Sequence, residues 1–521
     1  MTANTGSTAS VSEIVTDTAS SVYFFTDNQP PALIGAAMAR VSRSSSDLRE
    51  IWRNEFSADG LSQTEGLIGR VVTGFGDDSV QQLTPVQFAM EGISNWATKL
   101  VEWPRIGMGY LEQSTRYIFF DQKDADGRWK YYIPENLSPS MRARYCANMD
   151  LIFTIYSEIV HTLTEFIRER DAHLKEGDHD PAWMAATKAK ACDAARLMLP
   201  TATRSTVGFT GNAQSLSNLI IHLRSQSMVE AQDLADQLIE QARRLPYLAP
   251  FLERVDLPDR GLADALYRRT NRENMRELNA TRYARSNNMG ATAPYVKLVE
   301  FEPRTERELT AWLLIATADG LTLPEAQILT ADMVDDEVAH VIQTYVGERL
   351  NRRHKPGRGT ERAHFWWEVL DDYGTFRDLQ RHRMVDAFEW QRLTTLYGYS
   401  VPDAITDAGL EDQFRRCFEI SAELYDHMVF EGYAEEAQYA TLLGHRLRYT
   451  FGTNLRELFH FIELRTQPAG HDGYRAICQE MYRQLCEVYP QFGEAMCFVN
   501  TTGESDDLNR LAAERATRAK W

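Results

Sequence analysis

The stretch Phe376-Arg377-Asp378-Leu379-Gln380-Arg381-His382-Arg383 ends in three adjacent cationic or titratable side chains. It directly follows an apolar and aromatic run at positions 365–373, which we expect to be buried, whereas surface basic clusters usually lie among polar residues. An arginine guanidinium is a planar fork that matches phosphate or carboxylate oxygens two at a time. The stretch therefore predicts an anion-binding segment; the alternative is a solvated charge cluster.

Length and composition limit the class of protein. With 521 residues the chain is too long for one simple core, so we expect two domains. The net charge of -18 argues against binding to nucleic acid or to an anionic membrane, and an anionic substrate would need a local positive pocket. The six cysteines form no Cys-x-x-Cys pair, and no run of about 18 apolar residues is long enough to cross a membrane. Residues 1–21 resemble no secretion signal, which predicts a disordered tail and a cytoplasmic protein.

Hydrophobic periodicity predicts a mixture of helices and strands. Apolar residues recur at helical spacing in four stretches, at positions 150–170, 216–245, 414–429 and 454–465. An alternating pattern at 295–301 predicts a strand. Aromatic and β-branched runs on both sides of Asp124-Ala-Asp-Gly127 predict a β-hairpin.

Two helical segments share one pattern, which indicates an internal duplication. The first runs from Asn212-Ala-Gln214 to Leu223-Arg224, and the second from Asn454-Leu-Arg456 to Leu464-Arg465. In both, a Gly-containing turn precedes an Asn suited to N-capping, and such a helix N-terminus favours anions. The Asn-to-Arg offset is one residue longer in the first segment, so its register stays open. We predict a tail at 1–21, a first copy at 22–252, a linker at 253–290, a second copy at 291–500 and a C-terminal tail at 501–521.

These motifs, in this order, resemble the flavin-dependent thymidylate synthases. Arg381-His382-Arg383, followed by Asn454-x-Arg456 and Leu464-Arg465, is similar to that family's pattern, in which the first two elements bind flavin. Leu111-Glu-Gln-Ser114-Thr-Arg116-Tyr117 is similar to its nucleotide-binding loop.

Each copy departs from the family pattern where the other copy matches it. In the first copy, Trp103-Pro104-Arg105 stands at the Arg-His-Arg position and Gln214 replaces an arginine. In the second copy, the nucleotide-binding loop is missing, and Asp386-Ala-Phe388 with Gln391 lies in its place. The two copies are therefore complementary.

The resemblance implies an α/β (α+β) fold, with two tandem copies of an antiparallel sheet surrounded by long helices. Members of the family are homotetramers with active sites between subunits. A fused chain with two specialised halves is then expected to form a homodimer that mimics the tetramer, and each site would combine elements of both copies.

The resemblance also implies a function. The family moves a methylene group from methylenetetrahydrofolate to C5 of dUMP, with FAD that is reduced by NADPH, so small-molecule nucleotide and folate are the expected partners. Arg465, at the pyrimidine, and Arg383 would be catalytic. The residues that would hold FAD are Arg381, His382, Arg383, Asn454 and Arg456. Those that would bind the nucleotide are Gln113, Ser114, Thr115, Arg116, Arg105 and Arg224.

Simpler explanations exist for individual residues. Asn454 is also a plausible N-cap, Arg465 a cation at a helix C-terminus, and Arg116 a solvated strand residue. Two Glu-x-x-His pairs, Glu337–His340 and Glu361–His364, have the spacing of a carboxylate-bridged metal site, but the further glutamates of such bundles are not evident and we predict no metal. Two functional alternatives stay open. One is a related flavoenzyme that acts on another nucleotide or heterocycle, and the other is a non-catalytic flavin- or nucleotide-binding protein.

Overall fold

The computed structural model describes residues 14–26, 31–41, 44–56, 79–245, 247–283, 293–502, 508 and 510–519. The chain forms two compact units, and each unit is built from two segments. The first unit contains Met1–Gln113 and Arg204–Asn287, and the second contains Ser114–Thr203 and Asn288–Trp521. Residues 114–203, which belong to the first predicted copy, therefore fold with the second. Residues 1–13 of the expected N-terminal tail and 284–292 at the end of the expected linker lie outside the described residues.

The first unit contains a three-stranded antiparallel sheet of order β1-β3-β2. The strands are β1 (Pro85–Ser94), β2 (Met108–Glu112) and β3 (Arg204–Asn212). The helices of this unit are α2 (Pro31–Val41), α3 (Leu48–Ile51), α5 (Ser79–Leu83), α6 (Asn95–Val101), α9 (Ala213–Arg224), α10 (Val229–Arg243), α11 (Ala249–Asp256) and α12 (Gly261–Leu278). Ser94 caps α6 and Asn212 caps α9, because their side-chain oxygens accept backbone N–H groups of the first turn.

Helix α12 occupies the middle of the segment for which we predicted a linker. Its arginines reach the C-terminal end of α9: Arg272 donates to the Ser225 carbonyl at 3.2 Å and to Gln226 Oε1 at 2.8 Å, and Arg269 donates to the Arg224 carbonyl. A helix leaves its last carbonyl groups without intrahelical partners, so these cations satisfy acceptors that the fold exposes. These two arginines therefore attach α12 to the end of α9.

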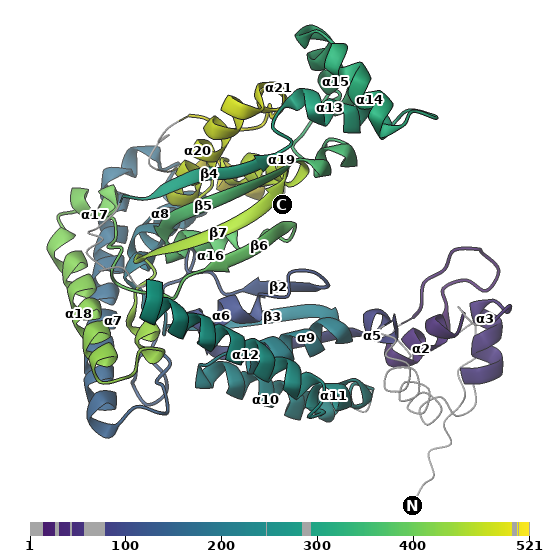
Figure 1. The fold of residues 1–521 in the computed structure, drawn as a ribbon. Coiled ribbons are helices and arrows are strands. Elements are labelled where there is room, and N and C mark those ends of the chain that lie inside the picture. Colours follow the sequence, from purple (N-terminus) through teal and green to yellow (C-terminus); the bar gives the residue numbers. More distant parts are fainter. Residues whose placement is uncertain are drawn as a thin grey trace, which may run out of the picture. The chain divides into compact units, whose positions relative to one another are not determined.

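The second unit contains a four-stranded antiparallel sheet of order β4-β5-β7-β6 (Figure 1). The strands are β4 (Tyr295–Glu302), β5 (His364–Asp372), β6 (Val385–Trp390) and β7 (Arg446–Asn454). The order β5-β7-β6 repeats the order β1-β3-β2 of the first unit. In the first unit, capped helices follow β1 and β3 along the chain. In the second unit, capped helices follow the corresponding strands, β5 and β7. This correspondence fits two tandem copies of one fold.

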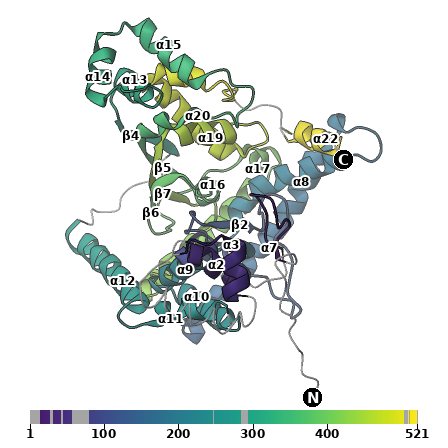
Figure 2. The same cartoon turned by 90° about the vertical axis from the view of Figure 1, so that its right-hand side faces the viewer.

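Helices of very different lengths accompany the second sheet. They are α7 (Pro139–Arg170), α8 (Pro181–Ala195), α13 (Glu306–Ile315), α14 (Leu323–Asp332), α15 (Asp335–Val346), α16 (Tyr373–Leu379), α17 (Asp403–Asp407), α18 (Glu411–Phe430), α19 (Leu455–Arg465), α20 (Asp472–Val488), α21 (Pro490–Ala495) and α22 (Leu511–Arg518). Helices α19 and α20 lie beside the sheet in both ribbon views, and α7 lies against α18 and α8 (Figures 1 and 2). The predicted mixture of antiparallel sheet and long helices is confirmed.

Most predicted elements form, with two differences. The strand at 295–301 is β4, and the helices at 150–170, 414–429 and 454–465 are parts of α7, α18 and α19. The stretch 216–245 is two helices, because the chain turns after Arg224. The expected hairpin is only a tight turn, closed by the Lys123–Trp129 bridge and by Gly127 at a φ of +77°. No helix in the described part of the chain is long and apolar enough to cross a membrane.

Helix α22 lies in the segment 501–521, where we expected a tail. It packs against α8, and Leu508 and Leu511 are buried. Arg515 fixes it by donating to Asp180 Oδ2 at 3.0 Å and to the Leu174 carbonyl at 2.8 Å. The last helix is therefore a packed part of the second unit.

A buried ion pair provides a test of this fold. Both terminal nitrogens of Arg349 donate to the Glu463 carboxylate at 2.6 Å, and the two side chains are 2% and 0% exposed. We expect Arg349→Ala to lower the free energy of unfolding by about 3–5 kcal/mol, because it leaves Glu463 buried without its cation. The exposed pair of Arg358 and Glu361 supplies the control, since Arg358→Ala should cost less than about 1 kcal/mol. Denaturant titration measures both, and equal losses would contradict the assignment.

Candidate active site

The Arg-His-Arg segment forms the turn between α16 and β6. His382 is buried at its centre, Arg381 is half-buried and Arg383 is exposed. Nδ1 of His382 lies 3.0 Å from Glu457 Oε1, and Nε2 accepts a hydrogen bond of 3.0 Å from Nε of Arg465. Burial, and after it the charge of Arg465, lowers the pKa of His382 well below its ordinary value, so the imidazole is neutral at pH 7.

The first turn of α19 carries the second motif. Asn454 is the N-cap, and its side-chain oxygen accepts the backbone N–H of Glu457 at 2.9 Å. Arg456 donates from Nε to the Pro356 carbonyl at 2.9 Å and lies 3.7 Å from Glu361. Asn454 thus has the N-cap role that we weighed as the simpler explanation. Burial raises the pKa of Glu457 to about 7, although Lys355 and Arg456 oppose the shift.

The nucleotide-like loop of the first copy lies in the same unit. Arg116 is buried, and its Nε and Nη2 pair with the two carboxylate oxygens of Asp193 at 2.7 and 2.8 Å. Its Nη1 donates to the Tyr474 hydroxyl at 3.0 Å. Arg465 lies over the same ring, with its Cζ 5.1 Å from the centroid, compared with 5.6 Å for Arg116. The loop of one copy and the closing arginine of the other therefore meet at Tyr474.

Two carboxylates, Asp193 and Asp378, neutralise this cluster. Burial alone would raise the pKa of Asp193, but Arg116 outweighs it and holds the value at about 2. Asp378 accepts from both Nη1 and Nη2 of Arg196 at 3.2 Å, and the cations Arg196, Arg116 and Arg465 hold its pKa below the ordinary range. Our sequence analysis gave no role to Asp193, Arg196, His471 or Tyr474. Asp378 lies in the opening stretch, three residues before Arg381, and this closeness to the basic residues was the available sequence signal for a carboxylate in the cluster.

A cavity of about 460 Å³ adjoins the cluster, which is a volume typical of sites for small molecules. Asp193 and His471 form part of its wall, together with the ends of β4 and β5 and the residues of α17. A second space of about 30 Å³ lies directly beside Arg116 and Lys190.

The remaining predicted nucleotide residues are distributed differently. Ser114 and Thr115 accompany Arg116 in the second unit, and Ser114 Oγ accepts the Arg116 backbone N–H at 3.2 Å. Gln113, Arg105 and Arg224 belong to the first unit. There Arg224 pairs with Asp236 at 3.0 Å and with Asp256 at 2.8 Å. Their predicted roles stay predictions.

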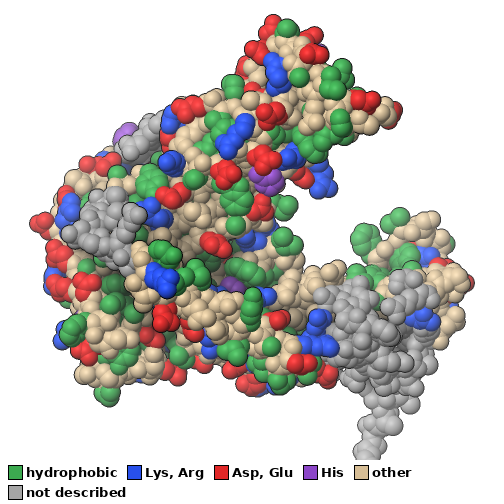
Figure 3. Space-filling view, viewed as in Figure 1, with side chains coloured by type: hydrophobic (Ala, Val, Ile, Leu, Met, Phe, Trp, Pro, Cys, Tyr) green, Lys and Arg blue, Asp and Glu red, His purple; other side chains and the backbone are tan. Residues whose placement is uncertain are grey.

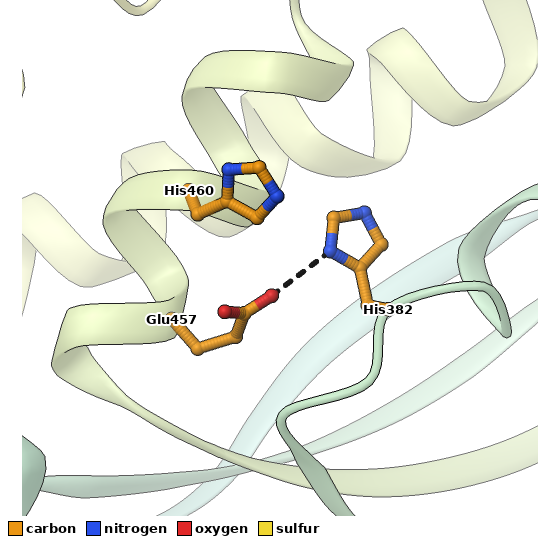
Figure 4. Close-up of side chains that lie close together, drawn as sticks. All are labelled: His382, Glu457 and His460. Carbon is orange, nitrogen blue, oxygen red and sulfur yellow. Dashed lines mark hydrogen bonds and ion pairs between the residues drawn. The ribbon is translucent and has the colours of Figure 1, made fainter. Parts of the chain in front are cut away.

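The two Glu-x-x-His pairs that we considered for metal have structural contacts of their own. Glu337 accepts the Val334 backbone N–H at the start of α15, and Glu361 pairs with Arg358. Among the described residues, the group with ligand atoms close enough for a metal ion is instead His382, Glu457 and His460 (Figure 4).

Charge on the surface gives no simple guide to an anion site. On the face drawn in Figure 3, basic and acidic side chains are interspersed. This face therefore shows no broad basic area.

Comparison with known proteins shows which family the chain resembles. The model of the thymidylate synthase complementing protein family, Thy1, matches residues 25–246 and 314–491. A UPF0159 protein of Chlamydia muridarum is 31% identical over 517 residues, which cover 95% of both chains. A flavin-dependent thymidylate synthase of Clostridium tetani is 25% identical over 174 residues, or 33% of this chain and 63% of that protein.

One solved structure is also similar in part. The crystal structure of the UMP/dUMP methylase PolB from Streptomyces cacaoi matches 41% of this chain and 98% of its own, with 18% identity and a TM-score of 0.33. The family match covers most of the chain, on both sides of the segment where the predicted copies join. The chain belongs to the thymidylate synthase complementing protein family.

Proposed function

We propose that this protein is a flavin-dependent thymidylate synthase-like enzyme that methylates dUMP, with methylenetetrahydrofolate as the one-carbon donor and FAD as the hydride carrier. The observation that carries the proposal is the meeting of Arg116, from the first copy, with Arg465, from the second, at one buried tyrosine ring. Membership of the Thy1 family supports the same reaction class.

The geometry of Arg116 suits a phosphate. A guanidinium has five N–H groups, and the contacts with Asp193 and Tyr474 use three of them. Two N–H groups remain for a phosphate, with the Ser114 hydroxyl in the same loop. The Asp193 carboxylate keeps the guanidinium in a fixed orientation before the ligand arrives, so less conformational entropy is lost on binding.

The donor set of the second copy suits a flavin dinucleotide. Arg383 is an exposed cation on the turn that also holds His382, and Arg456 is half-buried in the first turn of α19. Guanidinium forks match a pyrophosphate, and a helix N-terminus adds a favourable dipole. When it is bound and reduced by NADPH, FAD would supply the hydride.

The protein groups would orient the substrate and neutralise its charge. Arg465, which His382 holds over the Tyr474 ring, would polarise a pyrimidine carbonyl. Burial raises the pKa of the Cys192 and Cys417 thiols to about 12, so both are protonated and poorly nucleophilic at pH 7. These two thiols are therefore poor candidates for an enzyme nucleophile.

Several parts of the proposal remain as predictions from the resemblance. They are the use of NADPH and methylenetetrahydrofolate, the assembly of the chain into a homodimer, and the cytoplasmic location. A non-catalytic relative would bind flavin or nucleotide without forming dTMP, so product analysis separates the alternatives.

Flavin binding is the first test. The purified full-length chain should be yellow or take up added FAD, as measured by its absorption spectrum. We expect Arg383→Ala to weaken FAD binding by about tenfold or more, because a charge-assisted hydrogen bond contributes about 1.5–3 kcal/mol. Arg416→Ala, an exposed arginine of α18, should have no effect. A protein that takes up no FAD would refute the proposed cofactor.

Nucleotide binding is the second test, measured by calorimetry with dUMP on the FAD-loaded chain. Arg116→Lys keeps the positive charge beside Asp193 but loses the fork, so we expect about tenfold weaker dUMP binding with FAD retained. Arg416→Ala again supplies the control. Unchanged dUMP affinity in Arg116→Lys and also in Arg116→Ala would refute the phosphate assignment. Formation of dTMP from dUMP and methylenetetrahydrofolate would then establish the reaction.

A further inference from the structure

Glu457 has a buried carboxylate that none of the roles above requires. It lies in the first turn of α19, three residues after the N-cap Asn454 and eight residues before Arg465. Its side chain points toward His382, and Figure 4 shows the hydrogen bond between them. Glu457 is 6% exposed and His382 is 4% exposed, so this contact is shielded from water.

The contact with Arg465 decides where the proton of His382 lies. An arginine side chain always carries a hydrogen on Nε, so it can only donate. Nε2 of His382, 3.0 Å away, must therefore accept and has no hydrogen of its own. In the neutral imidazole the hydrogen is then on Nδ1, and the atom that faces Nδ1 at 3.0 Å is Glu457 Oε1.

We propose that Glu457 is a positioning residue: its carboxylate accepts the hydrogen of His382 Nδ1, which fixes the imidazole in the tautomer whose Nε2 holds the Arg465 guanidinium over Tyr474. The connection to catalysis rests on the proposed function, because there Arg465 contacts the pyrimidine. The tautomer itself does not depend on that function.

The surrounding contacts hold Glu457, His382 and Arg465 in one arrangement. The backbone N–H of Glu457 donates to Asn454, which fixes the start of the helix, and Nη2 of Arg465 donates to the Asp378 carbonyl at its end. The ring of His382 also packs on Phe461, with centroids 4.0 Å apart. Helix α19 is thus attached at both ends to the Arg-His-Arg turn, so a change at Glu457 is transmitted to Arg465 through a single imidazole.

A metal ion at His382, Glu457 and His460 is the competing explanation, because two imidazoles and a carboxylate are ligands that zinc accepts. A metal on Nδ1 would require the hydrogen of His382 to be on Nε2. That hydrogen would face the Nε hydrogen of Arg465 across 3.0 Å, and two donors repel each other. Metal-bound histidines instead give their second N–H to an acceptor. The Arg465 contact therefore favours the hydrogen-bonded arrangement.

The charge state of Glu457 sets the expected pH dependence. The groups that face it are Arg456 and His460 on its own helix, and His382 and Lys355 from other elements. Its pKa in the folded chain is about 7, above the ordinary value of 4.5. Above pH 7 the carboxylate is charged and the hydrogen bond to His382 is strongest; below pH 7 protonation weakens it. Stability follows the opposite sign, because the folded chain binds the proton more tightly and loses this contribution as pH rises from about 4.5 to 7.

Two substitutions separate these effects. Glu457→Gln keeps an oxygen acceptor without a charge, whereas Glu457→Leu removes the acceptor. In protein with ¹⁵N-labelled histidine, with the His382 signals assigned by their loss in His382→Asn, we expect a protonated Nδ1 and an unprotonated Nε2 in the wild type and in Glu457→Gln. Glu457→Leu should give a mixture of tautomers. Glu419→Gln, at an exposed glutamate of α18, is the matched control and should leave the signals unchanged.

The tautomer measurement needs no ligand, so it decides the proposal even if dUMP is not the substrate. A wild-type His382 with its hydrogen on Nε2, unchanged signals in Glu457→Leu, or binding of added zinc with a shift of Nδ1 would overturn it. If the wild type does bind dUMP, Glu457→Leu should bind it about tenfold more weakly.

The dependence of dUMP affinity on pH provides a second test. It would not change between variants if Glu457 had only a structural role. The dUMP phosphate titrates near pH 6 in every variant, so the difference between the wild type and Glu457→Gln is the quantity to measure. We expect the wild type to gain affinity through an inflection near pH 7 that is missing in Glu457→Gln. Parallel profiles would overturn the link between Glu457 and Arg465.

Discussion

The second unit depends on a balance between buried arginines and the carboxylates that face them. Arg116, Arg196 and Arg465 lie close together; the first two are buried and Arg465 is half-buried, and taking a cation out of water is costly unless it has a partner. Asp193 and Asp378 supply the partners, and their pKa values are lowered because the neighbouring cations stabilise the charged carboxylates. The arginines are held in fixed orientations, while part of the hydrogen-bonding capacity of Arg116 stays available for an anion.

The duplication explains how this balance arises. Arg116, Asp193 and Arg196 come from the segment 114–203 of the first copy, whereas Asp378, Arg465 and Tyr474 come from the second copy, and all six lie in one compact unit. By the resemblance to the family pattern, each copy lacks a motif that the other copy retains. A chain that carries both copies can therefore lose one set of motifs from each half and still combine one full set.

Two kinds of contact position Arg465. The aromatic ring of Tyr474 provides a surface for both guanidiniums, and His382 provides a directional acceptor. Because the imidazole has only one hydrogen when it is neutral, its bond to Arg465 and its bond to Glu457 are set together. The histidine of the Arg-His-Arg motif is thus a connecting group between Glu457 and Arg465.

The sequence alone determined the elements and the motifs. Periodicity located β4, α7, α18 and α19, because amphipathic spacing follows directly from the local geometry of helices and strands. The repeated Asn-capped helix indicated the duplication, and the corresponding strand orders of the two sheets fit it. Capping and turn residues such as Asn454 and Gly127 act within a few positions, so their local roles could be read from the order of residues.

The tertiary structure decided which residues meet. Asp193 and Asp378 are 185 positions apart, yet both face the same arginines, and the order of residues does not show that the two carboxylates meet. Long-range burial also decides three other features. They are the packing of segment 114–203 in the second unit, the packing of helix α22, and the Glu457–His382 hydrogen bond. Burial and charge pairing depend on the three-dimensional neighbours of a side chain, whereas the sequence specifies directly only its neighbours along the chain.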